Sequence, residues 1–171
     1  KDGAYVLNGV KKFVVDGQTA NTIIVSARES VSKTQDVISL FYVKDDAEGL
    51  TRKALSSIDE TRRLAQIELH HVTAERLGEA DASQPLSESL DIATICLAGE
   101  MSGVAQKLLE NEVEYAELRI QFGRPIGSFQ AIQHQCADML LGVELAKSAA
   151  YYASAAADEN DPELPILASQ A

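Results

Sequence analysis

The stretch YAELRIQFGRPIGSFQAIQH, residues 115–134, joins two long segments with helical periodicity and decides how the second half of the chain folds. Its first part is typical of a helix end, because Arg119 opposes the helix dipole, Gly123 suits a left-handed cap and Pro125 stops the helix. A new helix is expected to begin near Ser128. The segment therefore predicts a short connection between two antiparallel helices.

Apolar residues recur three and four positions apart on both sides of this connection. The first helix is expected from about Ser87, with acidic residues in its first turn. One apolar face of it is formed by Leu90, Leu97, Met101, Val104, Leu108 and Tyr115. The second helix is expected from about Ser128 to Ala157. Its apolar stripe is formed by Phe129, Ile132, Cys136, Leu140 and Val143. A polar turn at residues 158–162 leads to a third helix that begins near Pro165.

The first part of the chain carries strand signals instead. Asn8-Gly9 lies between two strand-like runs, and this pair favours a two-residue turn, so we expect an opening β-hairpin there. Three further runs are rich in β-branched and aromatic residues: Thr22–Ala27, Val37–Val43 and Ala65–Val72. Together they predict an antiparallel sheet or a small barrel.

The change of pattern predicts an α+β chain with two domains. We expect an antiparallel β-sheet or barrel domain over residues 1–83 and an antiparallel helical bundle domain over residues 84–171. The chain opens without Met, directly in a strand, and stops inside its third helix. We therefore expect a piece of a longer protein that is truncated at both ends.

Composition narrows the classes of function. The chain has 15 Lys and Arg residues and 26 Asp and Glu residues. Its net charge of -11 disfavours nucleic-acid binding, because it repels the phosphate backbone. No apolar run approaches the roughly 18 residues of a membrane span. Cys96 and Cys136 are expected in the core of a cytoplasmic protein. No metal site is expected, since neither these cysteines nor His70, His71 and His134 have partners at ligand spacing.

Taken whole, residues 115–134 resemble the acyl-CoA dehydrogenase signature, in which Arg, a polar residue, Phe and Gly end one helix and Phe-Gln opens the next. Asn8-Gly9, Lys12–Gly17, residues 59–63 and Val72–Gly78 follow in the family's order. The most similar branch is the bacterial one that includes small subunits of pimeloyl-CoA dehydrogenase. The resemblance implies FAD as cofactor, an acyl-CoA substrate and a homo- or hetero-oligomer such as a dimer of dimers. It also implies an electron-transfer flavoprotein or another electron acceptor as partner.

In that family the arginine at the helix end meets the flavin pyrophosphate, commonly that of the neighbouring subunit, which makes Arg119 the candidate here. A guanidinium suits this role because it presents a fork of donors and stays charged. The resemblance also implies hydrogen bonds to the cofactor from Gln121 and Gln130, and apolar walls at its adenosine end from Phe122 and Phe129. The structural alternatives are a helix-end cation for Arg119 and helix-start packing for Phe129 and Gln130.

The strand Phe13-Val14-Val15-Asp16-Gly17 lies where the family often has Trp-Ile-Thr-Asn-Gly against the flavin ring. Phe13 can still cover an aromatic face. Val15 cannot donate the hydroxyl hydrogen bond that the usual Thr makes near flavin N5. Packing in the core of the sheet is the alternative role for these residues.

Family members remove the α-proton of the thioester with a carboxylate while the β-hydrogen leaves as hydride to N5. In most branches this base lies beyond the position of Ala171, and in some it lies on the first long helix at the position of Ala93. Alanine cannot be a base, so no catalytic residue is expected in this chain. Asp91 and Thr94 are the candidates for substrate contact, with stabilisation of the helix dipole as the alternative for Asp91.

We therefore expect part of a FAD-dependent acyl-CoA dehydrogenase of fatty acid β-oxidation, inactive by itself, that converts an acyl-CoA thioester to the 2,3-enoyl-CoA. One alternative is a non-catalytic partner subunit of a heteromeric acyl-CoA dehydrogenase, which Val15, Ala93 and Thr94 suggest. Another is a flavin monooxygenase or a nitroalkane oxidase built on the same fold, since fold does not fix chemistry.

Overall fold

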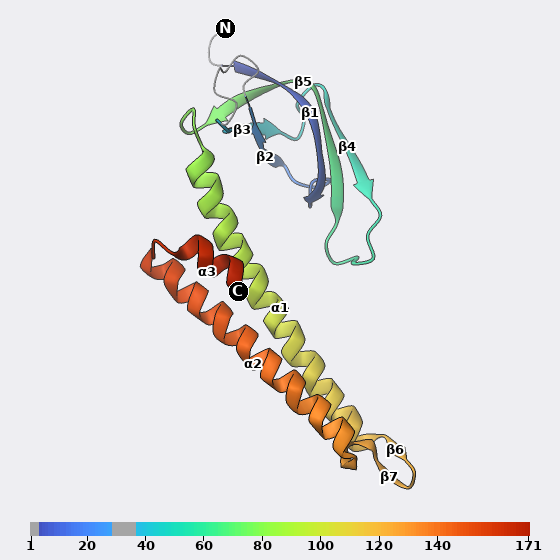
Figure 1. Cartoon of the computed structure of the whole chain (residues 1–171). Coiled ribbons are helices and arrows are strands. Elements are labelled where there is room, and N and C mark those ends of the chain that lie inside the picture. The colour runs from blue at the N-terminus through green and yellow to red at the C-terminus, as the bar shows by residue number, and fades with distance from the viewer. Residues whose placement is uncertain (1–3, 29–36) are drawn as a thin grey trace. The chain divides into compact units, whose positions relative to one another are not determined.

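The computed structural model describes residues 4–28 and 37–171, which fall into two compact units, Lys1–Pro85 and Leu86–Ala171 (Figure 1). Over the described residues, the first unit holds a five-stranded sheet, and the chain continues into three α-helices. The order of sheet first and helices second confirms the α+β class expected from the sequence.

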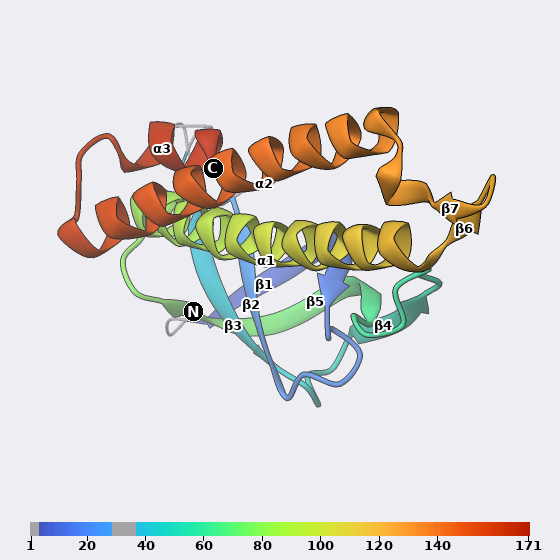
Figure 2. The ribbon, with the colours of Figure 1, turned by 90° about the horizontal axis from the view of Figure 1, so that it is seen from below.

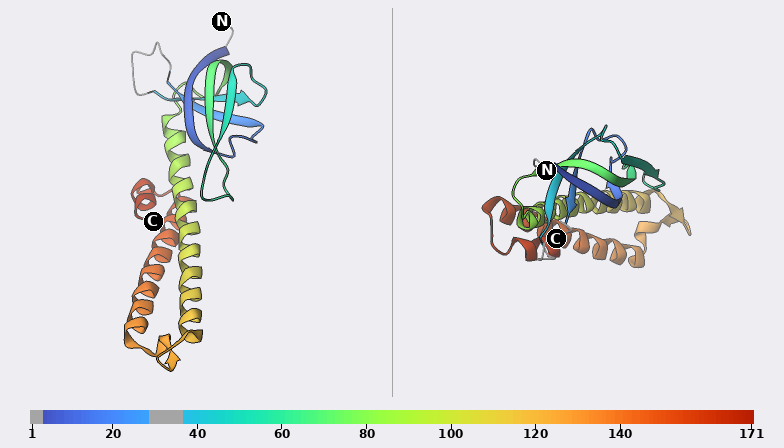
Figure 3. Two further views of the ribbon diagram at one scale, coloured as in Figure 1. Left: turned by 90° about the vertical axis from the view of Figure 1, so that its right-hand side faces the viewer. Right: turned by 90° about the horizontal axis from the view of Figure 1, so that it is seen from above.

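The sheet is antiparallel and curled (Figure 3). Its strands are β1 (Ala4–Val15), β2 (Thr22–Ala27), β3 (Ser39–Lys44), β4 (Leu50–Leu55) and β5 (Leu64–Leu77). They follow the order β1-β5-β3-β2, and β4 also pairs with β5. The long strand β5 therefore carries the sheet, because β1, β3 and β4 all pair with it.

One face of the sheet closes on an apolar core. The core consists of Leu7, Ile23, Val25, Phe41, Val43, Ala65, Ile67, Leu69, Val72 and Ala74. Along β5 every second side chain is buried up to Leu69, and the alternation resumes at Val72 after two exposed residues, His70 and His71. This change of phase marks a β-bulge.

The predicted hairpin at Asn8-Gly9 is wrong, because β1 runs through both residues as one strand. His70 and His71 of β5 together face Asn8, so the extra residue of the bulge belongs to β5. His71 has a φ of 56°, and its N–H donates to Asn8 Oδ1 at 2.9 Å. Pairing with β5 on both sides of Gly9 therefore outweighs the local turn preference of Asn8-Gly9.

Gly49 fixes the same bulge from the β4 side. Its carbonyl accepts a hydrogen bond from the His70 N–H at 3.0 Å, and its φ is 84°. A Cβ at this position would lie 2.0 Å from the His70 carbonyl oxygen. Only glycine fits this close approach of two backbones.

The other strands follow the sequence to different degrees. β2 matches the predicted run Thr22–Ala27, β3 begins at Ser39 rather than Val37, and β5 continues past Val72 to Leu77. β4 was not predicted, because Thr51 is its only β-branched residue. Its pairing with β5 shows that neighbouring strands, rather than its own composition, make it a strand.

The helices are α1 (Ser83–Leu118), α2 (Gln130–Glu159) and α3 (Leu164–Gln170). α1 begins four residues before the predicted Ser87 and has no acidic residue in its first turn. Asp81 accounts for the earlier start, because its Oδ1 accepts a hydrogen bond from the Ser83 N–H at 2.9 Å. The Ser83 hydroxyl and N–H together lower the pKa of the Asp81 carboxyl group.

α1 and α2 run side by side, with α3 at one end of the pair and their connection at the other (Figure 2). The buried residues of the two helices are mostly small: Ile95, Ala98, Ser102, Leu109 and Ala116 on α1, and Val143, Ala150, Ala153 and Ala156 on α2. The predicted apolar face of α1 is exposed instead, with Leu97, Met101 and Leu108 at 47%, 63% and 63%. This face therefore identified a helix but is left largely uncovered.

The cysteines differ from the expectation of two buried core residues. Cys96 on α1 is exposed, and Cys136 on α2 is half-buried. Cys96 follows Ile95, which is buried with Ala153 and Ala168, so its side chain points to a different face of the helix. Both remain free thiols.

We predict that Gly49→Ala destabilises the protein by about 2–5 kcal/mol, because it adds a clash with a backbone carbonyl to the cost of a left-handed residue. Gly78→Ala is the matched control, since Gly78 also has a positive φ of 73° but has open space around its Cβ position. The control should lose only about 1–2 kcal/mol. Urea unfolding measures both losses, and equal losses would contradict the role given to the Gly49–His70 approach.

Candidate functional site

Four of the predicted cofactor-binding residues lie on the connection between α1 and α2, and a fifth, Gln130, is the first residue of α2. The helix ends at Leu118, five residues before the predicted Gly123, although the Arg119 N–H still donates to the Tyr115 carbonyl at 2.8 Å. Two short strands follow, β6 (Ile120–Gln121) and β7 (Arg124–Pro125). A 3-10 turn, η1 (Ile126–Ser128), then leads into α2. The connection is thus a small hairpin rather than a simple helix cap.

Phe122 and Gly123 form the turn of this hairpin. Both have a positive φ, 52° and 79°, as in a type I′ turn. The left-handed Gly123 expected from the sequence is therefore present, but it serves a hairpin turn. Phe122 is unusual here, because a bulky residue rarely adopts this conformation and its side chain is 92% exposed. Such a strained, exposed aromatic residue marks a candidate for function.

The hairpin is fixed to the helix end by close backbone contacts. The Ile126 N–H donates to the Arg119 carbonyl at 2.8 Å. A Cβ at Gly127 would lie 3.0 Å from the Ala116 carbonyl oxygen, so the backbones nearly touch there. Gln133 of α2 adds a hydrogen bond from Nε2 to the Gly127 carbonyl at 2.9 Å. These contacts hold the side chains of the connection in defined places.

Aromatic and cationic side chains gather on this hairpin. The rings of Phe122 and Phe129 are nearly perpendicular, at 82°, with centroids 6.2 Å apart. The Arg124 guanidinium lies over the Phe129 ring, 4.1 Å from its centroid. Arg124 was not among the residues singled out from the sequence, although it lies within the stretch that carries the resemblance.

The connection carries two positively charged side chains, Arg119 and Arg124. Within residues 4–28 and 37–171, neither the Arg119 nor the Arg124 guanidinium makes a hydrogen bond or a salt bridge. Gln121 and Gln130, also exposed, add amide donors and acceptors. In a chain of net charge -11, two such arginines make a local attraction for an anion. With the two phenylalanine rings, the connection can bind a ligand that has both phosphate and an aromatic base.

Phe13 and Val15 lie in the sheet unit, at a second bulge where Lys12 and Phe13 together face Gln66. Phe13 has a φ of 58° and is 70% exposed, and Val15 is 57% exposed. Val14 between them is half-buried against the core. Core packing, the alternative role for this strand, is therefore wrong for Phe13 and Val15, whose side chains are available to a ligand.

The two candidates for substrate contact lie on α1. Asp91 is half-buried. The Thr94 hydroxyl donates to the Leu90 carbonyl at 2.8 Å, so its proton is used within the helix. Ala93 is exposed and carries no acid or base.

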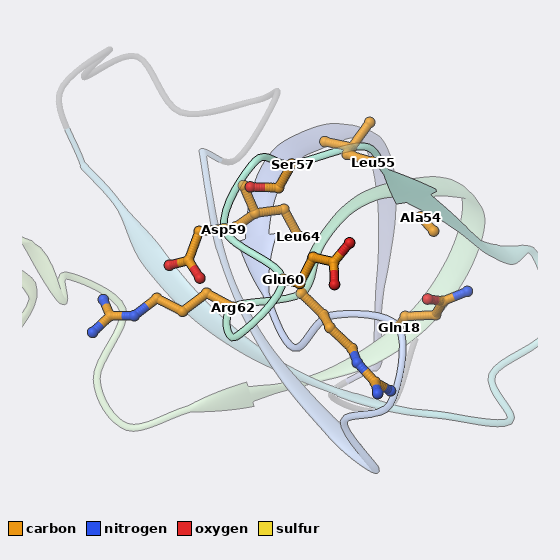
Figure 4. Close-up of a pocket in the computed structure, with 9 residues that line it drawn as sticks. Gln18, Ala54, Leu55, Ser57, Asp59, Glu60, Arg62 and Leu64 are labelled. Atoms are coloured by element: carbon orange, nitrogen blue, oxygen red, sulfur yellow. The ribbon is translucent and has the colours of Figure 1, made fainter.

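A cavity of about 330 Å³ on the sheet unit lies beside the loop between β4 and β5 (Figure 4). It is lined by Gln18, Ala54, Leu55, Ser57, Asp59, Glu60, Arg62, Arg63 and Leu64. Asp59 Oδ1 accepts hydrogen bonds from the Thr61 hydroxyl at 2.6 Å and N–H at 2.9 Å, and these bonds lower the pKa of Asp59. Sequence reasoning noted this loop only for its resemblance, because no chemical motif marks it.

Two negative findings apply to the described part of the chain. No group of three or more His, Cys, Asp or Glu side chains in residues 4–28 and 37–171 is placed to hold a metal ion. Across the same residues, no helix combines the length and the apolar character needed to cross a bilayer.

Two family models match the chain, and the second begins at the boundary of the two compact units. The model of the acyl-CoA dehydrogenase middle domain matches residues 1–72. The model of the acyl-CoA dehydrogenase C-terminal domain matches residues 85–171. The short-chain specific acyl-CoA dehydrogenase of Megasphaera elsdenii is 32% identical over 167 residues, which cover 94% of this chain and 44% of that protein.

Solved structures show the same fold. The butyryl-CoA dehydrogenase of Megasphaera elsdenii superposes with a TM-score of 0.89 at 30% identity, over 98% of this chain and 45% of that chain. A chain solved in work on the electron transferring flavoprotein of Acidaminococcus fermentans gives a TM-score of 0.91 at 30% identity, over 99% and 46%. The chain thus spans less than half the length of the relatives it matches.

The turn geometry predicts a difference between two substitutions at Phe122. Phe122→Asn and Phe122→Val both remove the aromatic ring, but asparagine tolerates a left-handed backbone and β-branched valine does not. The asparagine variant should therefore be more stable by about 1–2 kcal/mol in urea unfolding. The same pair at Ile120, which has no positive φ, is the control and should show no such advantage. Equal stability of the two Phe122 variants would contradict a left-handed residue at the turn.

Proposed function

Because this chain belongs to the acyl-CoA dehydrogenase family, we propose that it forms part of a FAD-dependent enzyme that oxidises an acyl-CoA thioester to the 2,3-enoyl-CoA. The observation that carries this proposal is the connection between α1 and α2. It combines the Arg119 guanidinium, which has no ion-pair partner among the described residues, with the rings of Phe122 and Phe129. FAD carries the two matching groups, a pyrophosphate and an adenine ring.

The residues of the connection fit the cofactor by the chemistry of their donors. Arg119 offers a bidentate fork to the pyrophosphate oxygens. Gln121 and Gln130 are exposed and offer hydrogen bonds, and Phe122 and Phe129 offer apolar surface to the adenosine end. We further propose that the flavin bound here belongs to a neighbouring subunit, so that the site is completed by assembly.

Phe13 and Val15 are proposed to lie against the flavin ring, because the bulge in β1 leaves both side chains exposed. When bound, FAD supplies the acceptor for the hydrogen that leaves the β-carbon of the acyl group. Phe13 gives an aromatic surface. Val15 offers an apolar surface but no hydroxyl donor, so any hydrogen bond from this position must come from the backbone.

Loss of the α-proton requires a carboxylate within hydrogen-bond reach of it. Ala93 excludes the position on α1 that some family members use, and we place the base outside the described residues. Asp91 and Thr94 remain the proposed contacts to substrate on α1. Thr94 can only accept a hydrogen bond from substrate, since its own proton is given to Leu90.

A second candidate is a non-catalytic partner subunit that completes the flavin site of a heteromeric acyl-CoA dehydrogenase. Val15 and Ala93 favour it, because Val15 lacks the hydroxyl that the family often has there and Ala93 lacks the base that some members carry at that position. Such a subunit holds the flavin but does not remove the α-proton. Both candidates therefore bind FAD, but only the dehydrogenase lets an acyl-CoA substrate reduce the flavin.

The helical unit supports an oligomer, either of identical or of different subunits. Leu97, Met101 and Leu108 of α1 are exposed, and apolar grooves of about 480 and 790 Å³, the larger lined in part by Leu108, lie between α1 and α2. We propose that further helices, from this protein or a second subunit, cover this surface. We propose that the reduced flavin passes its electrons to a partner protein, either an electron-transfer flavoprotein or another acceptor. The free thiols Cys96 and Cys136 suit the reducing cytoplasm.

The proposed reaction is tested by adding acyl-CoA thioesters of different chain length, without oxygen, to the full gene product loaded with FAD. A substrate should bleach the flavin absorbance and yield the 2,3-enoyl-CoA. Pivaloyl-CoA is the control, because its α-carbon has no hydrogen and cannot lose a proton. Retained FAD with no bleaching by any thioester would contradict dehydrogenase activity of this subunit and favour the non-catalytic candidate.

We predict that Arg119→Ala weakens FAD binding about tenfold or more in the full gene product, because each charge-assisted hydrogen bond contributes roughly 1.5–3 kcal/mol. Arg119→Lys should restore binding only in part, since it keeps the charge and loses the bidentate fork. The unfolding midpoint should change little in either variant, because the side chain is exposed. Unchanged FAD affinity in Arg119→Ala would leave Arg119 as a helix-end cation.

A further inference from the structure

We propose that Arg124 is a positioning residue of the nucleotide site and that it acts through the ring of Phe129. This inference rests on the proposed binding of FAD by the connection between α1 and α2. It adds a residue that makes no proposed contact with the cofactor itself.

The geometry of the pair is specific. The guanidinium carbon of Arg124 lies 4.1 Å from the centroid of the Phe129 ring, which is the distance of direct stacking. Within the described chain, Arg124 makes no hydrogen bond or ion pair that competes with this contact. Among the described residues, the Phe129 ring is thus the partner that holds the guanidinium, and the guanidinium covers one face of the ring.

Phe129 lies where its orientation matters. Its backbone starts α2, since its carbonyl accepts hydrogen bonds from the N–H groups of Ile132 and Gln133 at 3.0 and 3.2 Å. Its ring is half-buried and carries no hydrogen-bonding group, so packing contacts hold the ring in its direction. Phe122 approaches the ring almost at a right angle, and Arg124 stacks on it.

The hairpin places Arg124 over this ring. Arg124 pairs with Gln121 across β6 and β7, next to the left-handed turn at Phe122 and Gly123. With one face covered by Arg124, Phe129 presents its other face or its edge to an aromatic base. Loss of Arg124 therefore frees the ring to rotate.

The sheet unit provides a matched control. Arg76 lies over the ring of Tyr5, with the guanidinium carbon 5.4 Å from the centroid. Arg76→Gln therefore removes an arginine from an arginine–aromatic pair and changes the net charge by the same amount as Arg124→Gln. It does so in a pair that no part of the proposed site uses.

The test is the dissociation constant for FAD, measured by flavin fluorescence on the full gene product after removal of the cofactor. The variants are R124Q, R124K, F129L, the double variant R124Q/F129L and the control R76Q. R124Q should weaken FAD binding about 3- to 10-fold, and R124K should lose less, because a lysine ammonium still stacks on the ring. R76Q should stay within about twofold of the parent.

The double variant separates action through the ring from direct contact. If Arg124 acts through Phe129, R124Q should cost less than about twofold in the F129L background. If R124Q weakened FAD binding equally in the parent and in the F129L variant, the proposal would be overturned. It would also be overturned if R124Q bound FAD as tightly as R76Q does. If the parent protein fails to bind FAD, the proposed function fails as well. If it binds FAD in a way that depends on Arg119 but not on Arg124, only the present inference fails.

Discussion

The close approach of Gly127 to the Ala116 carbonyl oxygen is the contact on which the helical half of the candidate site depends. A Cβ at Gly127 would lie 3.0 Å from that oxygen, so glycine lets the chain return beside the helix it has just left without a shift of either backbone. The Ile126 N–H then reaches the Arg119 carbonyl at 2.8 Å and closes the hairpin. Because both ends are held, the turn between them keeps its left-handed conformation at Phe122.

The sheet unit uses the same kind of constraint. Gly49 lies against the His70 carbonyl, and the Asn8 side chain accepts a hydrogen bond from His71, so the bulge in β5 is held from both neighbouring strands. The second bulge, in β1, leaves Phe13 exposed beside the core. In both units, irregular backbone places the aromatic candidates for cofactor binding, and regular backbone supplies the support.

Local pattern predicted the elements of this chain better than their ends and faces. Periodicity identified α1 and α2, but the large apolar face of α1 was no guide to its packing, because other residues of α1, such as Ile95 and Ala98, are the buried ones. Asn8-Gly9 predicted a turn, and long-range pairing with β5 made it a strand. The resemblance supplied Arg119 and its neighbours. Arg124 was missed, because stacking on Phe129 depends on a hairpin that single-sequence reasoning took for a helix cap.

The central claim is that the connection between α1 and α2 binds a flavin nucleotide by its pyrophosphate. A structure of the full gene product with FAD bound tests it most directly, through the distance from the Arg119 guanidinium to the nearest pyrophosphate oxygen. We expect about 2.7–2.9 Å, the length of a charge-assisted hydrogen bond, with the flavin contributed by a neighbouring subunit. A bound FAD whose phosphates lie far from every copy of Arg119 would contradict the account.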